Sequence, residues 1–144
     1  MNKLKVIIFE DNHLIREALY AIINASDTFE CVAAFSDCKQ LVENIKAYQP
    51  QLILMDIEMP GMNGIEATKI ISQKFPEKRV LIQTVFNDSE RIFHAICAGA
   101  SGYILKTDPP QKLLDSLTEA YHGGAPMSAT IAQKVWQFFS RKNV

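Results

Sequence analysis

Cysteine is scarce in this chain of 144 residues, which contains three, at Cys31, Cys38 and Cys97. The number is odd and no pair has CxxC spacing, so the sequence indicates neither a disulfide framework nor a zinc site. Since unpaired cysteines are among the most buried side chains in proteins, we expect three buried free thiols.

Long apolar runs are also missing. Residues 6–9 and 52–55 are runs of four apolar residues, whereas a membrane-spanning helix needs about 20. The N-terminal apolar stretch ends at Glu10 and Asp11, and no small-residue cleavage site follows it. This start is typical of a mature cytosolic protein, so we expect a cytoplasmic location and no membrane partner.

An excess of charge of one sign is the third absence. Fifteen Lys and Arg residues face sixteen Asp and Glu residues, and the net charge is −1. This balance argues against direct DNA or anionic lipid binding by the whole chain. The hydrophobic content of 48% and the length fit one globular domain rather than two.

Short β-branched runs alternate with amphipathic helical patterns along the chain. The expected strands are 5–9, 30–34, 52–55, 79–84 and 102–105. The first, third and fourth are almost wholly apolar, as strands covered on both faces should be, so we place them in the middle of the sheet. The pattern predicts an α/β fold: a doubly wound five-stranded parallel sheet with five flanking helices and a sixth, C-terminal helix.

Each expected helix has a candidate N-cap residue. The first helix carries Leu14, Ala18, Ile22 and Ala25 at helical spacing, which predicts its apolar face. The second would run to about Tyr48, before Pro50, the third to about Lys74, and the fifth to the stop at 123–124. The six candidate caps, in chain order, are Asn12, Ser36, Asn63, Asp88, Asp108 and Ser128.

The sixth helix follows the last complete β–α unit. We divide the chain into a globular domain, 1–124, and a C-terminal segment, 125–144. The segment carries Ile131, Val135 and Phe139 on one helical face. It could pack on its own domain, or it could be a linker or contact surface, and the sequence leaves both readings open.

Polar residues follow the expected strands where each one ends. Glu10 and Asp11 follow the first strand, Asp56 the third, Thr84 ends the fourth, and Lys106 follows the fifth. Ligands bind at the carboxyl ends of the strands in open parallel sheets, so these residues should converge. Three close carboxylates repel one another unless a cation neutralises them, and an oxygen-only set favours Mg²⁺ or Mn²⁺.

This constellation suits phosphoryl chemistry. A carboxylate held beside a divalent ion can act as the nucleophile and form an aspartyl phosphate. The hydroxyl of Thr84 and the ammonium of Lys106 would bind the equatorial oxygens of the phosphoryl group.

The same residues resemble the receiver domain of two-component response regulators. The resemblance rests on Glu10, Asp11, Thr84 and the stretches 54–64 and 99–106, and it covers residues 4–122. The stretch 99–106 and the Gly-Gly end of the fifth helix are most similar to the NarL/LuxR-type subfamily. The resemblance implies the flavodoxin-like strand order 2-1-3-4-5. Members usually join the receiver to a C-terminal DNA-binding domain, which would lie outside this chain.

Roles at the site follow from the resemblance. It implies that Asp56 accepts the phosphoryl group from a sensor histidine kinase. Asp11 would bind the metal directly, Glu10 largely through water, and Glu58 through its backbone carbonyl. Glu10 stands where the family more often has Asp, which keeps the charge but lengthens the arm.

The resemblance also implies a switch. On phosphorylation the Thr84 hydroxyl would move to the phosphoryl oxygen, and the ring of Tyr103 would fill the vacated space. The altered surface would change dimerisation or partner binding and so control transcription. The chain would form a homodimer, and would not be an enzyme acting on a separate small-molecule substrate.

Three alternatives remain open from the sequence. A phosphohydrolase with an aspartate nucleophile needs a second carboxylate two residues on, where Glu58 stands, but no cap domain is present. A flavodoxin-like cofactor binder needs a first loop that cradles phosphate, which Glu10 and Asp11 would repel. The third alternative is a receiver-like interaction module that works without phosphorylation.

Overall fold

A single parallel sheet forms the centre of the molecule in the computed structural model, which describes residues 2–142. Its five strands have the order β2-β1-β3-β4-β5, so the predicted fold class and strand order are confirmed. Apolar β1, β3 and β4 occupy the three central positions, as their composition predicted. The strands are β1 (Leu4–Phe9), β2 (Phe29–Phe35), β3 (Leu52–Met55), β4 (Arg79–Thr84) and β5 (Gly102–Leu105).

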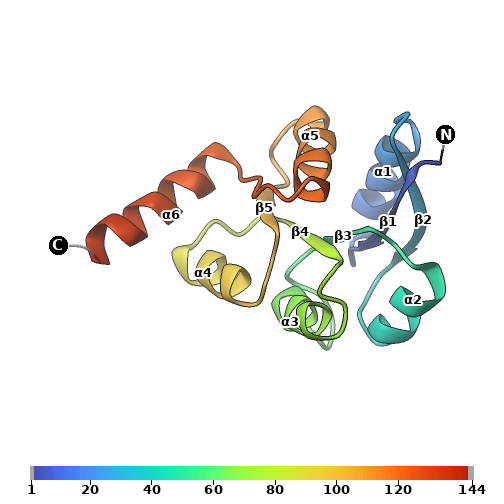
Figure 1. The fold of residues 1–144 in the computed structure, drawn as a ribbon, viewed down its shortest axis with the longest axis horizontal. Helices are drawn as coiled ribbons and strands as arrows, with labels where there is room; N and C mark the ends of the chain where they lie inside the picture. The colour runs from blue at the N-terminus through green and yellow to red at the C-terminus, as the bar shows by residue number, and fades with distance from the viewer. Residues whose placement is uncertain (1, 143–144) are drawn as a thin grey trace.

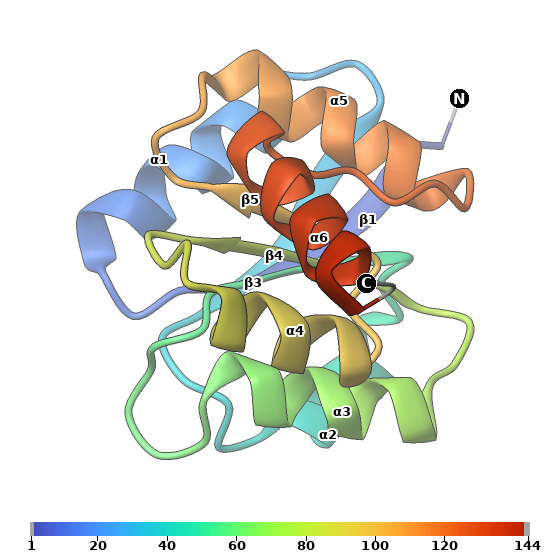
Figure 2. The same ribbon diagram turned by 90° about the vertical axis from the view of Figure 1, so that its left-hand side faces the viewer.

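Helices cover both faces of this sheet (Figure 1). One face carries α1 and α5, the other carries α2, α3 and α4, and α6 lies beyond the β5 edge (Figures 1 and 2). The helices are α1 (His13–Asn24), α2 (Leu41–Tyr48), α3 (Gly64–Lys74), α4 (Ser89–Cys97), α5 (Pro110–Tyr121) and α6 (Ala129–Lys142). Among the described residues, no helix is long and apolar enough to cross a membrane.

The core has two halves because successive strand side chains point to opposite faces of the sheet. In β1, Val6 and Ile8 belong to the half under α1 and α5. Ile7 and Phe9 belong to the half under α2, α3 and α4. Residues 6–9 of β1 are buried and apolar in both halves, so the first polar residue, Glu10, comes directly after the end of the strand.

Local capping signals position three of the helices as predicted. The Asn12 side chain accepts a hydrogen bond from the Ile15 N–H at the start of α1. Asn63 and Glu66 form a reciprocal capping box at α3. Asp88 caps α4.

Two helix predictions are wrong. The buried face of α1 is formed by Leu19 and Ile23, whereas Leu14 is 78% exposed. The second helix begins at Leu41 rather than after Ser36. The Asp37 carboxylate accepts a hydrogen bond from the Lys39 N–H, and this local turn replaces the first helical turn.

Asp108 does not cap α5, which has Pro109 at its N-cap position. The Asp108 carboxylate instead accepts a hydrogen bond from the Ser128 hydroxyl. The Ser128 carbonyl accepts from the Ala132 N–H at the start of α6, and the bonds of the Ser128 hydroxyl that the described residues show go to Leu105 and Asp108. The prediction of three buried thiols also needs correction, because Cys31 and Cys38 are buried and Cys97 is exposed.

The C-terminal segment packs on the rest of the chain. Ile131 is fully buried, Val135 is half-buried, and Phe139 is exposed, so the predicted apolar face is covered only along its first part. The rings of Phe93 in α4 and Phe138 in α6 lie 5.1 Å apart. Residues 143 and 144 of the predicted segment 125–144, and residue 1 of the predicted domain 1–124, lie outside the described residues.

Candidate functional site

The strand register brings the polar residues to one edge of the sheet. Phe9 at the end of β1 pairs with Met55 at the end of β3, so Glu10 and Asp56 follow side by side. The Asp56 N–H donates to the Phe9 carbonyl at 3.0 Å, which extends this pairing by one residue. The Lys106 N–H likewise donates to the Thr84 carbonyl at 2.9 Å.

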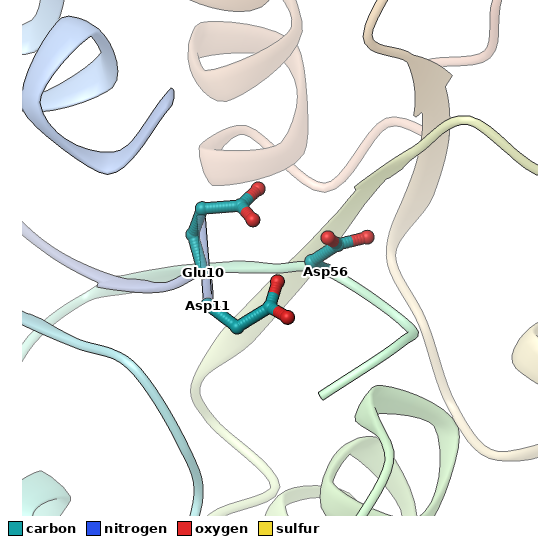
Figure 3. Close-up of side chains that lie close together, drawn as sticks. All are labelled: Glu10, Asp11 and Asp56. Carbon is teal, nitrogen blue, oxygen red and sulfur yellow. The ribbon is translucent and has the colours of Figure 1, made fainter. Parts of the chain in front are cut away.

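Three carboxylates meet at this edge (Figure 3). Oxygen atoms of Glu10, Asp11 and Asp56 all lie within 4.8 Å of one another. Glu10 and Asp56 are buried, and Asp11 is exposed, so the cluster opens to solvent on the Asp11 side. This oxygen-only set, with one solvent-facing member, fits a hard divalent cation that keeps some of its water.

Lys106 lies between the two buried carboxylates. Its Nζ is 2.6 Å from Glu10 Oε1 and 2.7 Å from Asp56 Oδ2, and its side chain is 14% exposed. Burial lowers the pKa of Lys106, but the hydrogen bonds to Asp56 and Glu10 outweigh burial and hold that pKa above its ordinary value. The amine therefore stays charged and offsets part of the local negative charge.

Backbone N–H groups orient the same two carboxylates. Asp56 Oδ1 accepts from the Ile57 N–H at 2.7 Å, which leaves Oδ2 to face Lys106. Glu10 Oε2 accepts from the Asn12 N–H at 3.0 Å. Burial raises the pKa of Glu10, with a further contribution from Asp56, and the bonds from Lys106 and Asn12 offset only part of this rise.

The predicted switch pair, Thr84 and Tyr103, is buried and meets at the backbone of Phe86. Thr84 Oγ1 accepts from the Phe86 N–H at 3.4 Å. The Tyr103 hydroxyl donates to the Phe86 carbonyl at 2.8 Å, and its ring is 1% exposed. Burial raises the pKa of Tyr103 well above its ordinary value, so its hydroxyl remains a donor. The predicted exchange of positions between the two side chains stays a prediction.

Glu58 stands apart from the carboxylate cluster. Its side chain is exposed, and the three-carboxylate group found among the described residues does not include it. The predicted role of Glu58 is carried by its backbone carbonyl, two residues after Asp56, and stays a prediction.

Sequence reasoning missed Arg16, which supports the acidic turn. Its Nη1 donates to the Glu10 carbonyl at 2.8 Å and lies 3.4 Å from the Asp11 carbonyl. The guanidinium therefore holds the two peptide groups from which both carboxylates project. A basic residue one helical turn after the Asn12 cap was the available signal, because that turn faces back toward the end of the strand.

The chain matches proteins of one family. The response regulator receiver domain family matches residues 6–118. The transcriptional regulatory protein DegU of Brevibacillus brevis is 34% identical over 140 residues, which are 97% of this chain and 59% of that protein. The oxygen regulatory protein NreC of Staphylococcus aureus is 37% identical over 121 residues, 83% of this chain and 56% of that protein.

A solved structure agrees with these matches. A LuxR-family two-component response regulator from Aurantimonas superposes with a TM-score of 0.89 at 29% identity, over 96% of this chain and 99% of that one. The chain spans little more than half of the two sequence relatives, 59% of DegU and 56% of NreC. It belongs to the response regulator receiver domain family, and within it to the NarL/LuxR-type group.

Proposed function

We propose that this receiver domain is a phosphorylation-operated switch in which Asp56 accepts a phosphoryl group from a sensor histidine kinase. The observation that carries the proposal is the position of Asp56. It is buried at a strand end, paired with Lys106 at 2.7 Å, and clustered with Glu10 and Asp11. A structural aspartate at a strand end has no need of two further carboxylates and a buried amine.

Glu10, Asp11 and Asp56, with the carbonyl of Glu58, would hold Mg²⁺ or Mn²⁺. The bound ion would neutralise negative charge on the carboxylates and on the incoming phosphoryl group. Glu10 already shares the charge of Lys106, and its longer arm reaches that amine directly. This suits the expected role of Glu10, which acts on the metal largely through water.

The transfer needs one bond made and one broken. A carboxylate oxygen of Asp56 attacks phosphorus and forms a P–O bond, while the P–N bond to the donor histidine breaks and its electron pair stays on the imidazole nitrogen. The Lys106 ammonium and the Thr84 hydroxyl would donate to the phosphoryl oxygens. Lys106 is already placed for this, because it contacts the nucleophile's own Oδ2.

The output follows from the family. Residues beyond this chain would include a DNA-binding domain that controls transcription, in line with DegU being a transcriptional regulatory protein and with the partial coverage of both relatives. The chain itself would signal by a change in its dimer or partner surface, in the cytoplasm, and would not turn over a separate substrate. The alternative is an interaction module that signals by binding alone.

Intact-protein mass spectrometry after incubation with acetyl phosphate tests the proposal. We expect a gain of one phosphoryl group that requires Mg²⁺, occurs in the wild type, and is lost in Asp56→Asn. Asp27→Asn, at an exposed position, is the matched control and should be phosphorylated normally. Equal phosphorylation of Asp56→Asn would overturn the site assignment. No gain in a folded wild type would favour the module that works by binding alone.

A further inference from the structure

The segment that leads into α6, residues 126–128, adds a short parallel pairing to the edge of β5. The Tyr103 N–H donates to the Pro126 carbonyl at 2.9 Å, and the Ser128 N–H donates to the Tyr103 carbonyl at 3.2 Å. The Ser128 hydroxyl accepts from the Leu105 N–H at 2.9 Å and donates to the Asp108 carboxylate. Ser128 is itself buried, so one side chain ties the lead-in segment to both ends of the β5–α5 connection.

Helix α6 continues this attachment across α4 (Figure 2). Ile131 lies in the same apolar cluster as Tyr103, and Met127 and Val135 pack against that cluster. The Lys134 ammonium donates to the carbonyl of Asn87, which lies in the loop between the end of β4 and the start of α4. Apolar contacts and two separate polar anchors therefore hold α6.

These anchors adjoin the proposed phosphorylation site. Leu105, which Ser128 holds, directly precedes Lys106. The lead-in segment bonds to both the N–H and the carbonyl of Tyr103. The Tyr103 hydroxyl in turn donates to the Phe86 carbonyl. The Phe86 N–H in turn contacts the Thr84 hydroxyl. The lead-in segment thus contacts the strand that carries Tyr103 and that Lys106 directly follows.

We infer that Ser128 is a positioning residue, and that docking of α6 and phosphorylation of Asp56 stabilise each other. This inference rests on the proposed function. The lead-in segment holds the backbone of Tyr103, whose ring is buried. It also fixes Leu105, the last residue of β5, directly before Lys106. A phosphoryl group that draws the Thr84 hydroxyl toward Asp56 favours the same buried ring. Because coupling between two sites is reciprocal, each event must strengthen the other by the same factor.

The test uses two measurements on the full chain. Hydrogen exchange of the amides in residues 129–139 reports on α6, and titration with beryllium fluoride in Mg²⁺ reports on the site without covalent chemistry. In the wild type, we expect saturating beryllium fluoride to slow exchange in α6 several-fold. In Asp56→Asn, beryllium fluoride should leave that exchange unchanged.

Two variants remove the polar anchors separately. Ser128→Ala should weaken beryllium fluoride binding about five-fold, because it removes buried hydrogen bonds. Lys134→Met, at a partly exposed position on α6, should weaken it about two-fold. Both variants should also speed α6 exchange. Ser101→Ala, beside β5 but outside this network, is the control and should change neither readout.

The outcomes separate the two claims. If beryllium fluoride binds the wild type and leaves α6 exchange unchanged, the coupling is wrong and the proposed function stands. The coupling is also wrong if Lys134→Met frees α6 while the affinity for beryllium fluoride stays the same. This second variant keeps the test decisive should Ser128→Ala fail to fold. Absence of binding to a folded wild type would overturn the proposed function and the coupling together.

Discussion

Lys106 serves two carboxylates at once, and this double contact makes it the most consequential single residue of the site. Its amine forms an ion pair with both Glu10 and Asp56, which are buried. A buried carboxylate that loses the cation with which it is paired carries an uncompensated desolvation cost. The native state without a divalent cation therefore depends on Lys106 for stability, in addition to the role proposed for this amine in phosphoryl chemistry.

Replacement of this amine gives a prediction at the residue scale. Lys106→Met should lower the free energy of unfolding in EDTA by roughly 2–3 kcal/mol, less than for a fully buried pair because the Lys106 side chain keeps some solvent contact. Mg²⁺ should recover part of the loss, because the three carboxylates then attract the cation without competition. Urea denaturation with and without Mg²⁺ measures both effects.

The matched control is Lys69→Met, at an exposed position on α3. It should change stability by less than about 0.5 kcal/mol. Equal stability of Lys106→Met and the wild type in EDTA would mean that Lys106 does not compensate the carboxylates.

At the scale of elements, the site depends on how closely α3 approaches the end of β3. Gly64 is the first residue of α3, and its N–H donates to the Ile57 carbonyl at 2.7 Å. A Cβ atom at this position would overlap the carbonyl oxygen of Asp56. Glycine is therefore required here by space, because its neighbour is backbone that cannot turn away.

Gly64→Ala should push α3 away from the loop that carries Asp56. We expect a loss of about 1–3 kcal/mol in the free energy of unfolding, the usual cost of overpacking. Mg²⁺-dependent phosphorylation should also slow, since Asp56 shifts against Lys106. Chemical denaturation and the acetyl phosphate assay measure the two effects, with Lys69→Ala on the same helix as control. Unchanged stability and rate would show that the contact relaxes without cost.

Strand positions were predictable from sequence because an apolar run covered on both faces has few alternatives. The ends of β3, β4 and β5 were placed to the residue, and these ends fix where Asp56, Thr84 and Lys106 emerge. Helix faces were less certain. In α1 the residues Leu14 and Leu19 begin competing apolar stripes, and only packing against the sheet selects the second.

The missed features of the site are contacts between segments distant in sequence. Asp108 is a residue type that commonly caps a helix, and it stands directly before the prolines of α5. Its carboxylate instead accepts a hydrogen bond from the Ser128 hydroxyl, twenty residues further on. The bridge from Lys106 to Glu10 needs the longer arm of Glu10 and the register of four strands, β1, β3, β4 and β5. No local pattern encodes such pairings, because each partner has an ordinary structural explanation on its own.

For the whole molecule, the position of α6 decides which surfaces remain available. It packs on α4 beside the β5 edge (Figures 1 and 2). Ile131 lies in the apolar cluster there, and the Phe138 ring contacts Phe93 of α4. The face of the sheet that carries α1 and α5 leaves apolar side chains in solvent. Leu14 and Tyr20 on α1 and Tyr121 on α5 are all exposed. If the chain forms the homodimer expected of its family, two copies could therefore associate through the α1–α5 face without displacing α6.

Two substitutions on opposite sides distinguish the faces. Leu14→Glu should shift sedimentation of the phosphorylated chain toward the monomer, since it places a charge on an exposed apolar position of α1. Trp136→Glu, on α6, exchanges a side chain that is 77% exposed and should leave the association unchanged. Both positions are solvent-exposed in the monomer, so neither variant should lose its fold, and circular dichroism checks this. Dissociation by Trp136→Glu alone would instead place the dimer contact on α6, and the coupling between α6 and Asp56 would then act directly on assembly.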